Sequence, residues 1–274
     1  MGYFARPIRE YVSTDAPPPC VAEHTTLPQV QRELDRHAVS ALPVVDDRGR
    51  VTGMISRSDL LQAGVVRRGG RWHRASLELP DDPARALMTK NPLSLPLTAT
   101  VSEAVEILLR ERLHQLVAID DGQLAGIFSV RNAMCAVIDD RVPIALESLM
   151  TPGVVAVRAV EPVQRALERL ETAQVHALVV TDGELPIGLF GQPEALAAMR
   201  AMTPSRVEDW LDARLLCAPT TLAAHRAATQ AVALGVDHIV ALDHGTMAGI
   251  LTASDLARSG LPEDRQEALR PRST

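Results

Sequence analysis

Four copies of one pattern run along the chain, and their spacing limits what it can fold into. Each copy reads as an apolar run, an acidic turn with a Gly, a small apolar strand containing Gly, and a helix start. The glycines of the last strand are Gly53, Gly126, Gly188 and Gly249, spaced 73, 62 and 61 residues apart. This period exceeds that of common solenoid repeats, so each copy is expected to be a small fold in itself.

An amphipathic helix is predicted ahead of each apolar run. In the second copy, Thr100 and Glu103 form a capping-box pattern before apolar residues spaced as on one helix face. Those residues are Val101, Ala104, Val105 and Leu108, and the third copy repeats the spacing at Val163, Ala166, Leu167 and Leu170. The apolar runs are short and β-rich, with hairpin-type turns between them. A mixed α/β (α+β) chain of four β-α-β-β-α repeats follows.

Composition narrows the class of protein. Hydrophobic residues make up 46% of the 274 residues and aromatics only 3%, so a packed core of aliphatic side chains is expected. The net charge of −6 argues against binding nucleic acid over the whole surface. Cys20, Cys135 and Cys217 are too scattered for a disulfide framework or a zinc site. No signal peptide or membrane span is recognisable, so a cytoplasmic protein is the expectation.

The repeats resemble the cystathionine β-synthase (CBS) domain, a regulatory repeat that binds adenosine nucleotides. The stretches that carry the resemblance are "SALPVVDDRGRVTGMISRSDL" in the first copy, "LMTKNPLSLPLTATVSEAVEILLRERLHQLVAIDDGQLAGIFSV" in the second, "LMTPGVVAVRAVEPVQRALERL" in the third and "GILTASDL" in the fourth. Such repeats pair into flat Bateman modules, so four copies imply two modules in tandem.

The resemblance sets the expected domain boundaries, with the two modules meeting near Arg141 to Leu146. The expected order is an N-terminal extension (1–16), repeat one (17–64), a linker loop (65–83), repeat two (84–140), repeat three (146–200), repeat four (206–260) and a charged tail (261–274).

Two nearly identical octets, "GMISRSDL" and "GILTASDL", close the first and fourth repeats. Their Ser56-to-Asp59 and Thr252-to-Asp255 spacing fits a helix capping box. It also fits a nucleotide site, since an ionised carboxylate accepts two hydrogen bonds from a vicinal diol. The resemblance implies that Asp59 and Asp255 bind ribose, with Ser56 and Thr252 near the phosphate. Both interpretations remain open from the sequence alone.

The second and third repeats depart from this pattern. Repeat two ends in Ser129-Val130-Arg131-Asn132, with an amide in place of the acid. Repeat three reads Gly191-Gln192-Pro193-Glu194, without the hydroxyl. Each predicted module therefore combines one intact site with one altered site.

Further ligand contacts are expected at the strand entries and inside the octets. The strand-entry candidates are Ser40, Ala41, Leu42 and Pro43 in repeat one, His114 in repeat two, and Asp237, His238 and Ile239 in repeat four. Ser254, Arg57 and Arg131 are candidates within the octets, although each arginine equally fits a solvated helix start. His114 and His176 share the register of Ser40, but they fall in different modules, and no metal site is predicted from them.

The favoured function is a non-enzymatic sensor that binds AMP, ADP, ATP or S-adenosylmethionine, carries no resident cofactor, forms a homodimer and acts on a regulated protein partner. One alternative is an interaction scaffold whose pockets are lost. Another is a nucleic-acid binder through the loop Arg67–Arg74, whose arginines surround Trp72. The recognisable phosphate-loop, nucleophile-elbow and metalloprotease motifs are missing, which argues against an enzyme.

Overall fold

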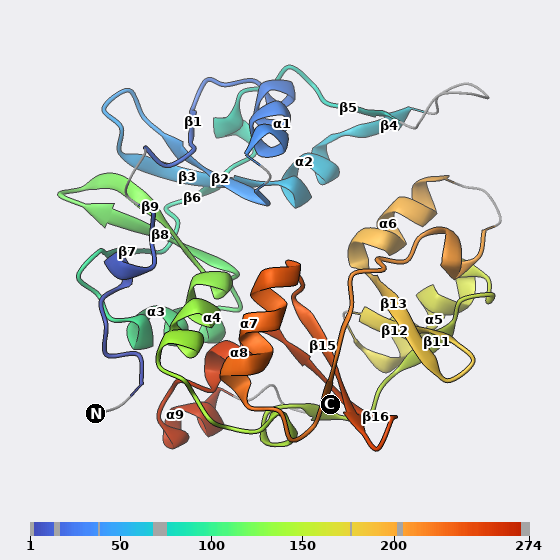
Figure 1. Cartoon of the computed structure of the whole chain (residues 1–274). Coiled ribbons are helices and arrows are strands. Elements are labelled where there is room, and N and C mark those ends of the chain that lie inside the picture. The colour runs from blue at the N-terminus through green and yellow to red at the C-terminus, as the bar shows by residue number, and fades with distance from the viewer. Residues whose placement is uncertain are drawn as a thin grey trace. The chain divides into compact units, whose positions relative to one another are not determined.

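The computed structural model describes residues 3–13, 17–37, 39–67, 76–175, 177–201 and 205–269 (Figure 1). Helices and strands alternate along the chain, which confirms the predicted mixed α/β class. The chain forms two compact units. The N-terminal unit comprises Arg6–Ala104 and Leu113–Ser129, and the C-terminal unit comprises Met1–Ala5, Val105–Arg112 and Val130–Thr274.

The order strand, helix, strand, strand, helix occurs four times. Repeat one has β1 (Val21–Ala22), α1 (Leu27–Arg36), β2 (Ala41–Val45), β3 (Val51–Ser56) and α2 (Arg57–Ala63). Repeat two has β7 (Ser94–Pro96), α3 (Val101–Arg110), β8 (Gln115–Asp120), β9 (Gln123–Ser129) and α4 (Val130–Asp139). Repeat three has β11 (Ala156–Arg158), α5 (Val163–Ala173), β12 (Ala177–Asp182), β13 (Leu185–Gly191) and α6 (Gln192–Ala201). Repeat four has β14 (Leu216–Pro219), α7 (Ala224–Leu234), β15 (His238–Asp243), β16 (Thr246–Thr252) and α8 (Ala253–Arg258).

Each repeat is built on an antiparallel hairpin whose first strand also pairs in parallel with the strand before the helix. In repeat two the hairpin closes through Asp121 and Gly122, with φ of 45° and 77°. Both angles fit the mirror-image turn that two-residue hairpins favour, and Gly adopts it without a Cβ clash. The predicted capping box of α3 is present, since Thr100 N donates to Glu103 Oε2 at 2.7 Å.

Within the N-terminal unit, the segment ahead of the first strand of each repeat packs on the other repeat. Strand β6 (Thr89–Lys90) comes just before β7 in repeat two but pairs with β3 of repeat one. Conversely, the 3₁₀ helix η1 (Ile8–Glu10) precedes repeat one, yet Ile8 N donates to Ala99 O of repeat two at 2.8 Å. This exchange joins repeats one and two into one module.

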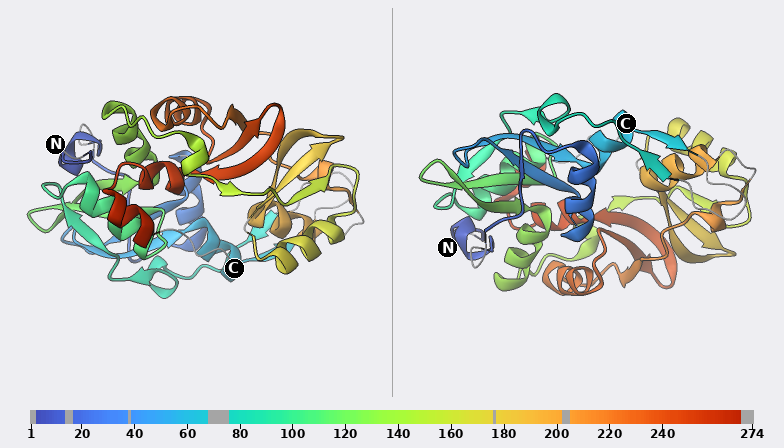
Figure 2. Two further views of the ribbon diagram at one scale, coloured as in Figure 1. Left: turned by 90° about the horizontal axis from the view of Figure 1, so that it is seen from below. Right: turned by 90° about the horizontal axis from the view of Figure 1, so that it is seen from above.

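The same exchange joins repeats three and four in the C-terminal unit. Strand β10 (Thr151–Pro152) comes just before β11 in repeat three and runs beside β16 of repeat four (Figure 2). The segment after the 3₁₀ helix η4 (Val207–Asp209) returns to repeat three, where Asp212 and Leu189 exchange two backbone hydrogen bonds of 2.9 Å. The sheets meet through Val179, Leu189 and Val240, which are all buried. The chain thus carries the tandem modules that the repeats predict.

Helix α4 follows the strands of repeat two but belongs to the C-terminal unit. It packs against α7 and α8 of repeat four. The C-terminal side of α8 is covered further by the tail helix α9 (Glu263–Ala268), where Gln266 Nε2 donates to Leu261 O at 2.7 Å. The N-terminal residue Phe4 is buried beside Gly260. Helix α8 therefore has neighbours on several sides.

The linker between repeats one and two differs from the expected loop. It contains a hairpin of β4 (Val65–Arg67) and β5 (Ser76–Glu78), followed by the 3₁₀ helix η2 (Ala84–Ala86). The β-branched Val65 and Val66 favour an extended strand, which the many charges around them obscured. The residues between the two strands lie outside the described part of the chain.

Candidate functional site

The repeat-one octet forms a complete capping box at the start of α2. Asp59 Oδ2 accepts from Ser56 N and Ser56 Oγ, both at 2.7 Å, and Asp59 N donates to Ser56 Oγ at 3.2 Å. Among the described residues, no donor contacts Asp59 Oδ1 within hydrogen-bond distance, and the side chain is only partly buried. The cap therefore uses one carboxylate oxygen, and the other has no partner among the described residues.

The repeat-four octet makes the same cap but uses its second oxygen as well. Asp255 Oδ2 accepts from Thr252 N and Thr252 Oγ1, both at 2.8 Å. Asp255 Oδ1 accepts from Arg258 Nη2 at 2.7 Å. Asp255 is 5% exposed and Arg258 is 4% exposed, so this ion pair is buried. Ser254, which directly precedes Asp255, is partly buried.

The altered octet of repeat three keeps part of the capping role. In repeat three, Gly191 N donates to Glu194 Oε2 at 2.9 Å, so the acid caps α6 without a hydroxyl partner. In repeat two, Asn132 is partly buried near the start of α4. An amide carries both a donor and an acceptor, so it is a less selective partner for a diol than a carboxylate.

The two octet arginines are engaged with helix ends. Arg57 Nη2 donates to Leu34 O in the last turn of α1 at 2.8 Å, and Arg57 Nε donates to Val39 O, in the segment between α1 and β2, at 3.0 Å. Its Nη1 pairs with Asp35 at 2.5 Å. Arg131 Nη2 donates to Val232 O of α7 at 2.6 Å. The bonds to Leu34 O and Val232 O satisfy carbonyls in the last turns of α1 and α7, which cations near a helix C-terminus commonly do.

The strand-entry candidates differ in burial and in register. Leu42 and Ile239 are buried in the hydrophobic interior. Ala41 and His238 instead stand opposite the octet hydroxyls, paired in register with Ser56 and Thr252. The remaining candidates are the exposed Ser40, His114 and Asp237 and the buried Pro43.

His238 makes the repeat-four entry titratable where repeat one has alanine. Burial lowers the pKa of His238 below its ordinary value, and nearby carboxylates oppose this shift. Those carboxylates are Asp237, Asp255, Glu194 and Asp212. Asp212 is itself paired with Arg214 at 2.9 Å, a contact that holds the pKa of its carboxyl low.

Two exposed apolar side chains lie at matching positions, directly before the first strands β7 and β11 of repeats two and three. Neither was among the candidates predicted from the sequence. Leu93 is 47% exposed and Val155 is 37% exposed. The backbone carbonyl of each accepts from the following sheet, Leu93 O from Val117 N at 3.2 Å and Val155 O from Val179 N at 3.0 Å. The signal for both was present in the repeated "LMT" that precedes them by a few residues.

Arg258 was also absent from the candidates. It stands three residues after Asp255, a spacing that brings helical side chains together. The matching position in repeat one is Gln62, which is exposed.

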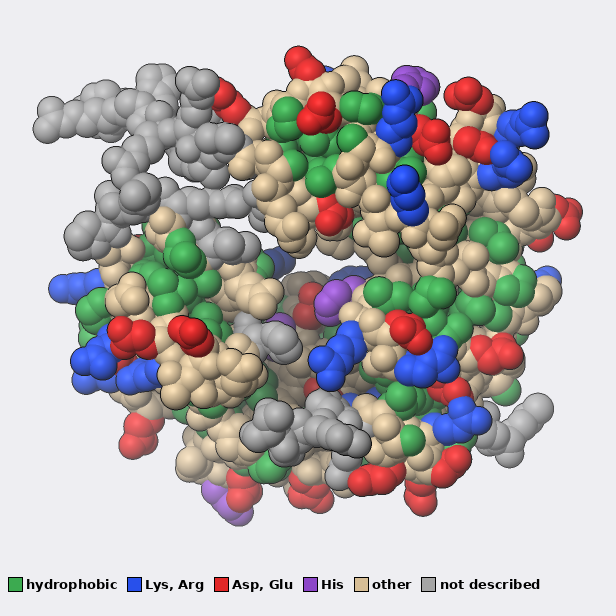
Figure 3. Space-filling model, turned by 180° about the vertical axis from the view of Figure 1, so that it is seen from behind, with side chains coloured by type: hydrophobic (Ala, Val, Ile, Leu, Met, Phe, Trp, Pro, Cys, Tyr) green, Lys and Arg blue, Asp and Glu red, His purple; other side chains and the backbone are tan. Residues whose placement is uncertain are grey.

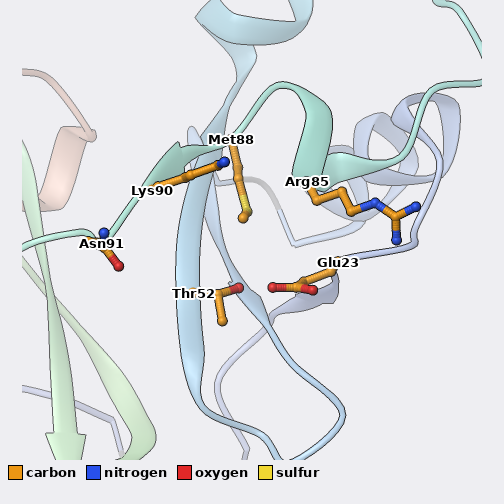
Figure 4. Close-up of a pocket in the computed structure, with 6 residues that line it drawn as sticks. All are labelled: Glu23, Thr52, Arg85, Met88, Lys90 and Asn91. Atoms are coloured by element: carbon orange, nitrogen blue, oxygen red, sulfur yellow. The ribbon is translucent and has the colours of Figure 1, made fainter.

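An open polar depression of about 380 Å³ lies elsewhere on the N-terminal unit, as Figure 4 shows. Its lining residues are Glu23, Thr52, Arg85, Met88, Lys90 and Asn91. Glu23 and Thr52 point toward each other there, while the Arg85 guanidinium points away. Thr52 precedes Ser56 by four residues of strand, roughly 13 Å, so the depression is separate from the Asp59 carboxylate.

The remaining predictions from the sequence concern the Arg67–Arg74 loop, the histidine register, a metal site and a membrane span. His176, Arg68, Arg71, Trp72 and Arg74 lie outside the described residues. On the face in Figure 3, the described basic side chains are interspersed with acidic ones. The described residues contain no group of three or more His, Cys, Asp or Glu side chains arranged to hold a metal ion. In the described part of the chain, no helix combines the length and apolar character needed to cross a membrane.

Comparison with solved structures supports the same fold. A Methanocaldococcus jannaschii protein described as an archaeal homologue of the AMPK γ subunit superposes with a TM-score of 0.69 at 16% identity, covering 92% of this chain and 99% of that one. A conserved protein from Pyrococcus horikoshii gives a TM-score of 0.62 at 16% identity, covering 93% and 100%.

Sequence relatives match only part of the chain. A 17.7 kDa protein of Acidianus ambivalens is 28% identical over 120 residues, which is 43% of this chain and 66% of that protein. The pig 5'-AMP-activated protein kinase subunit gamma-3 is 29% identical over 102 residues, 36% of this chain and 19% of that subunit. An A-adding tRNA nucleotidyltransferase of Aquifex aeolicus is 25% identical over 138 residues, 50% of this chain but only 15% of the enzyme.

The family model named CBS domain matches residues 8–65, 84–139 and 146–200, which together make up more than half of the chain. Repeat four lies outside these ranges but has the same element order. The chain belongs to the CBS domain family.

Proposed function

We propose that this protein is a non-enzymatic regulatory module that binds an adenosyl ligand, AMP, ADP, ATP or S-adenosylmethionine, in its repeat-one-and-two module. Ligand binding shifts the module between states with different affinity for a regulated protein. Such a shift requires that the ligand binds one state more tightly than the other.

The observation that carries the proposal is that only one of the two Asp59 carboxylate oxygens accepts hydrogen bonds from described residues. Asp59 Oδ2 is fixed by Ser56, which orients the group, while no described donor occupies Oδ1. A fixed, ionised acceptor at a partly buried position suits a ribose hydroxyl, because hydrogen bonds to charged groups are stronger than neutral ones.

An apolar surface for the base is also available in the N-terminal unit. Strand β6 pairs with β3, and strand β7 pairs with β8. The exposed Leu93 lies in the short segment that connects β6 to β7. An adenine ring stacked there would cover apolar surface that is otherwise hydrated. Ser40 and His114, both exposed, are the proposed polar neighbours at the two strand entries.

The relatives support a nucleotide rather than another small molecule. The name of the pig kinase subunit includes activation by AMP, and this chain aligns with 102 of its residues. The aligned enzymes are much longer than the matched segments, so their catalytic activities are not proposed for this chain.

The test is a calorimetric titration of one preparation with AMP, ATP and S-adenosylmethionine in turn. We expect saturable binding of at least one of them, weakened roughly ten- to hundredfold by Asp59→Ala, since a hydrogen bond to a charged group contributes about 1.5–3 kcal/mol. Asn132→Ala is the matched control and should change the affinity much less. Equal affinity in the wild type and Asp59→Ala would refute the ribose assignment.

One observation favours the alternative of an interaction scaffold without ligand binding. Both carboxylate oxygens of Asp255 in repeat four are bonded to protein donors. The scaffold alternative predicts no heat of binding with any of the three ligands. Formation of a homodimer is a further part of our proposal, and light scattering at micromolar concentration checks it.

A further inference from the structure

The buried contact between Asp255 and Arg258 sets repeat four apart from repeat one. Both Asp255 oxygens have protein partners, and the pair is almost inaccessible to water. Arg258 Nη2 also lies 3.5 Å from Leu149 O, in the segment that leads into β10. A ribose hydroxyl therefore meets no unoccupied oxygen at this carboxylate.

The packing around α8 explains why this arginine is held inside. Helices α4 and α7 pack against α8, and the tail residue Gln266 donates to Ser259 O at 3.2 Å. An arginine removed from water in this way needs a carboxylate partner, because an unpaired buried charge is strongly unfavourable. Asp255 is the carboxylate within reach at the three-residue helical spacing.

We propose that Arg258 is a latch that competes with the ligand for Asp255, so the repeat-four site stays closed while this ion pair is formed. The inference rests on the proposed adenosyl-binding function. It makes the four-repeat chain asymmetric, because ligand binds at repeat one first, and repeat four binds only after Arg258 has left Asp255. The exposed Gln62 at the matching position of repeat one forms no such latch.

The first experiment removes the latch in a chain whose repeat-one site is already disabled. AMP is titrated calorimetrically into Asp59→Ala and into Asp59→Ala/Arg258→Met, where Met is unbranched and cannot donate to Asp255. The latch predicts that the second variant binds AMP at least about tenfold more tightly, the gain expected when a charged acceptor becomes available. Adding Asp255→Asn to that variant should reverse the gain. An unchanged or weakened affinity in Asp59→Ala/Arg258→Met would overturn the proposal.

The second experiment installs the latch in repeat one and does not depend on the stability of the Arg258 variant. Gln62→Arg places a guanidinium three residues after Asp59 at an exposed position, where the substitution carries little folding risk. We expect AMP affinity to fall about two- to fivefold, because a competing ion pair at an exposed position is weak, while the control Gln62→Met, without a donor, binds as the wild type does. AMP binding by Gln62→Arg at wild-type affinity would contradict the latch.

The outcomes separate the latch from the proposed function. Failure of the wild type and all variants to bind AMP, ATP or S-adenosylmethionine refutes the adenosyl function itself. Wild-type binding that neither Arg258→Met nor Gln62→Arg alters refutes only the latch.

Discussion

The octets of repeats one and four share a sequence pattern and a capping geometry but differ in what remains for a ligand. In both, a hydroxyl residue and an acid close a capping box with bonds of 2.7–2.8 Å to the carboxylate. In repeat one the second oxygen has no described partner, whereas in repeat four it is bonded to a buried arginine. The motif therefore identifies a carboxylate, and the packing around it decides whether both carboxylate oxygens are bonded within the protein or one has no described protein partner.

The largest expected difference is in stability. Asp255→Ala leaves Arg258 buried without a counter-ion, which should cost about 3–5 kcal/mol in the free energy of unfolding. Asp59→Ala removes only a helix cap, which should cost about 0.5–2 kcal/mol. Urea unfolding of both variants gives the comparison. Equal losses would show that Asp255 and Arg258 are not a buried pair in solution.

An apolar replacement of the pair sharpens this point. Asp255→Leu/Arg258→Met should regain most of the stability lost in Asp255→Ala, because exchanging a buried ion pair for apolar residues is often neutral or favourable. The measurement is the same urea titration. If the double variant is as unstable as Asp255→Ala, the loss comes from the cap or from packing rather than from an unpaired charge.

The repeated glycines Gly53 and Gly249 predict a smaller difference in stability between repeats one and four. A Cβ at Gly249 would lie 2.5 Å from the backbone oxygen of Thr151, whereas one at Gly53 meets the Met88 side chain. Gly249→Ala should therefore cost about 1–3 kcal/mol, and Gly53→Ala less, because a methionine side chain can move and a paired backbone cannot. Thermal unfolding of the two variants tests the order, which reverses if Met88 is the more rigid neighbour.

The smallest expected effect is on pH dependence. Burial lowers the pKa of His238 in the folded protein, so the unfolded chain binds its proton more readily. His238 should therefore favour unfolding progressively as the pH falls below the ordinary histidine range, and its effect should vanish at neutral pH and above. Melting temperatures of the wild type and His238→Gln between pH 7.5 and 5.5 isolate this contribution. Identical pH profiles would exclude it.

Much of the fold follows from local sequence signals. The hairpin turns, the capping box of Thr100 and Glu103, and the order of elements all depend on neighbouring residues, and each is found. The exchange of segments does not follow from such signals. A two-residue strand such as Thr89–Lys90 carries too little information to choose its partner among similar sheets. The backbone conformation is local, whereas the pairing partner is decided by packing.

The candidate site shows the same division. Asp59 and Asp255 are indistinguishable in local pattern, and the role of each as a ribose ligand remains a prediction. Arg258 is visible in the sequence, but its 4% exposure depends on α4, which lies more than a hundred residues earlier in the chain. Likewise, Arg57 is the residue type expected for a phosphate contact, and only the folded chain shows that its guanidinium donates to Leu34 O at the end of α1 and to Val39 O just beyond it.

The most direct test of the difference between the octets is the stoichiometry and affinity of AMP binding in Asp59→Asn and Asp255→Asn, measured by calorimetry beside the wild type. Asparagine keeps the side-chain shape and one acceptor oxygen for the helix cap, while it removes the negative charge and replaces the other oxygen with an amide donor. Circular dichroism of both variants checks that they are folded, since Asp255→Asn also leaves Arg258 without its counter-ion. We predict one strong AMP site per chain in the wild type, weakened roughly tenfold or more in Asp59→Asn and unchanged in Asp255→Asn. A strong site that survives Asp59→Asn and disappears in Asp255→Asn would contradict the account.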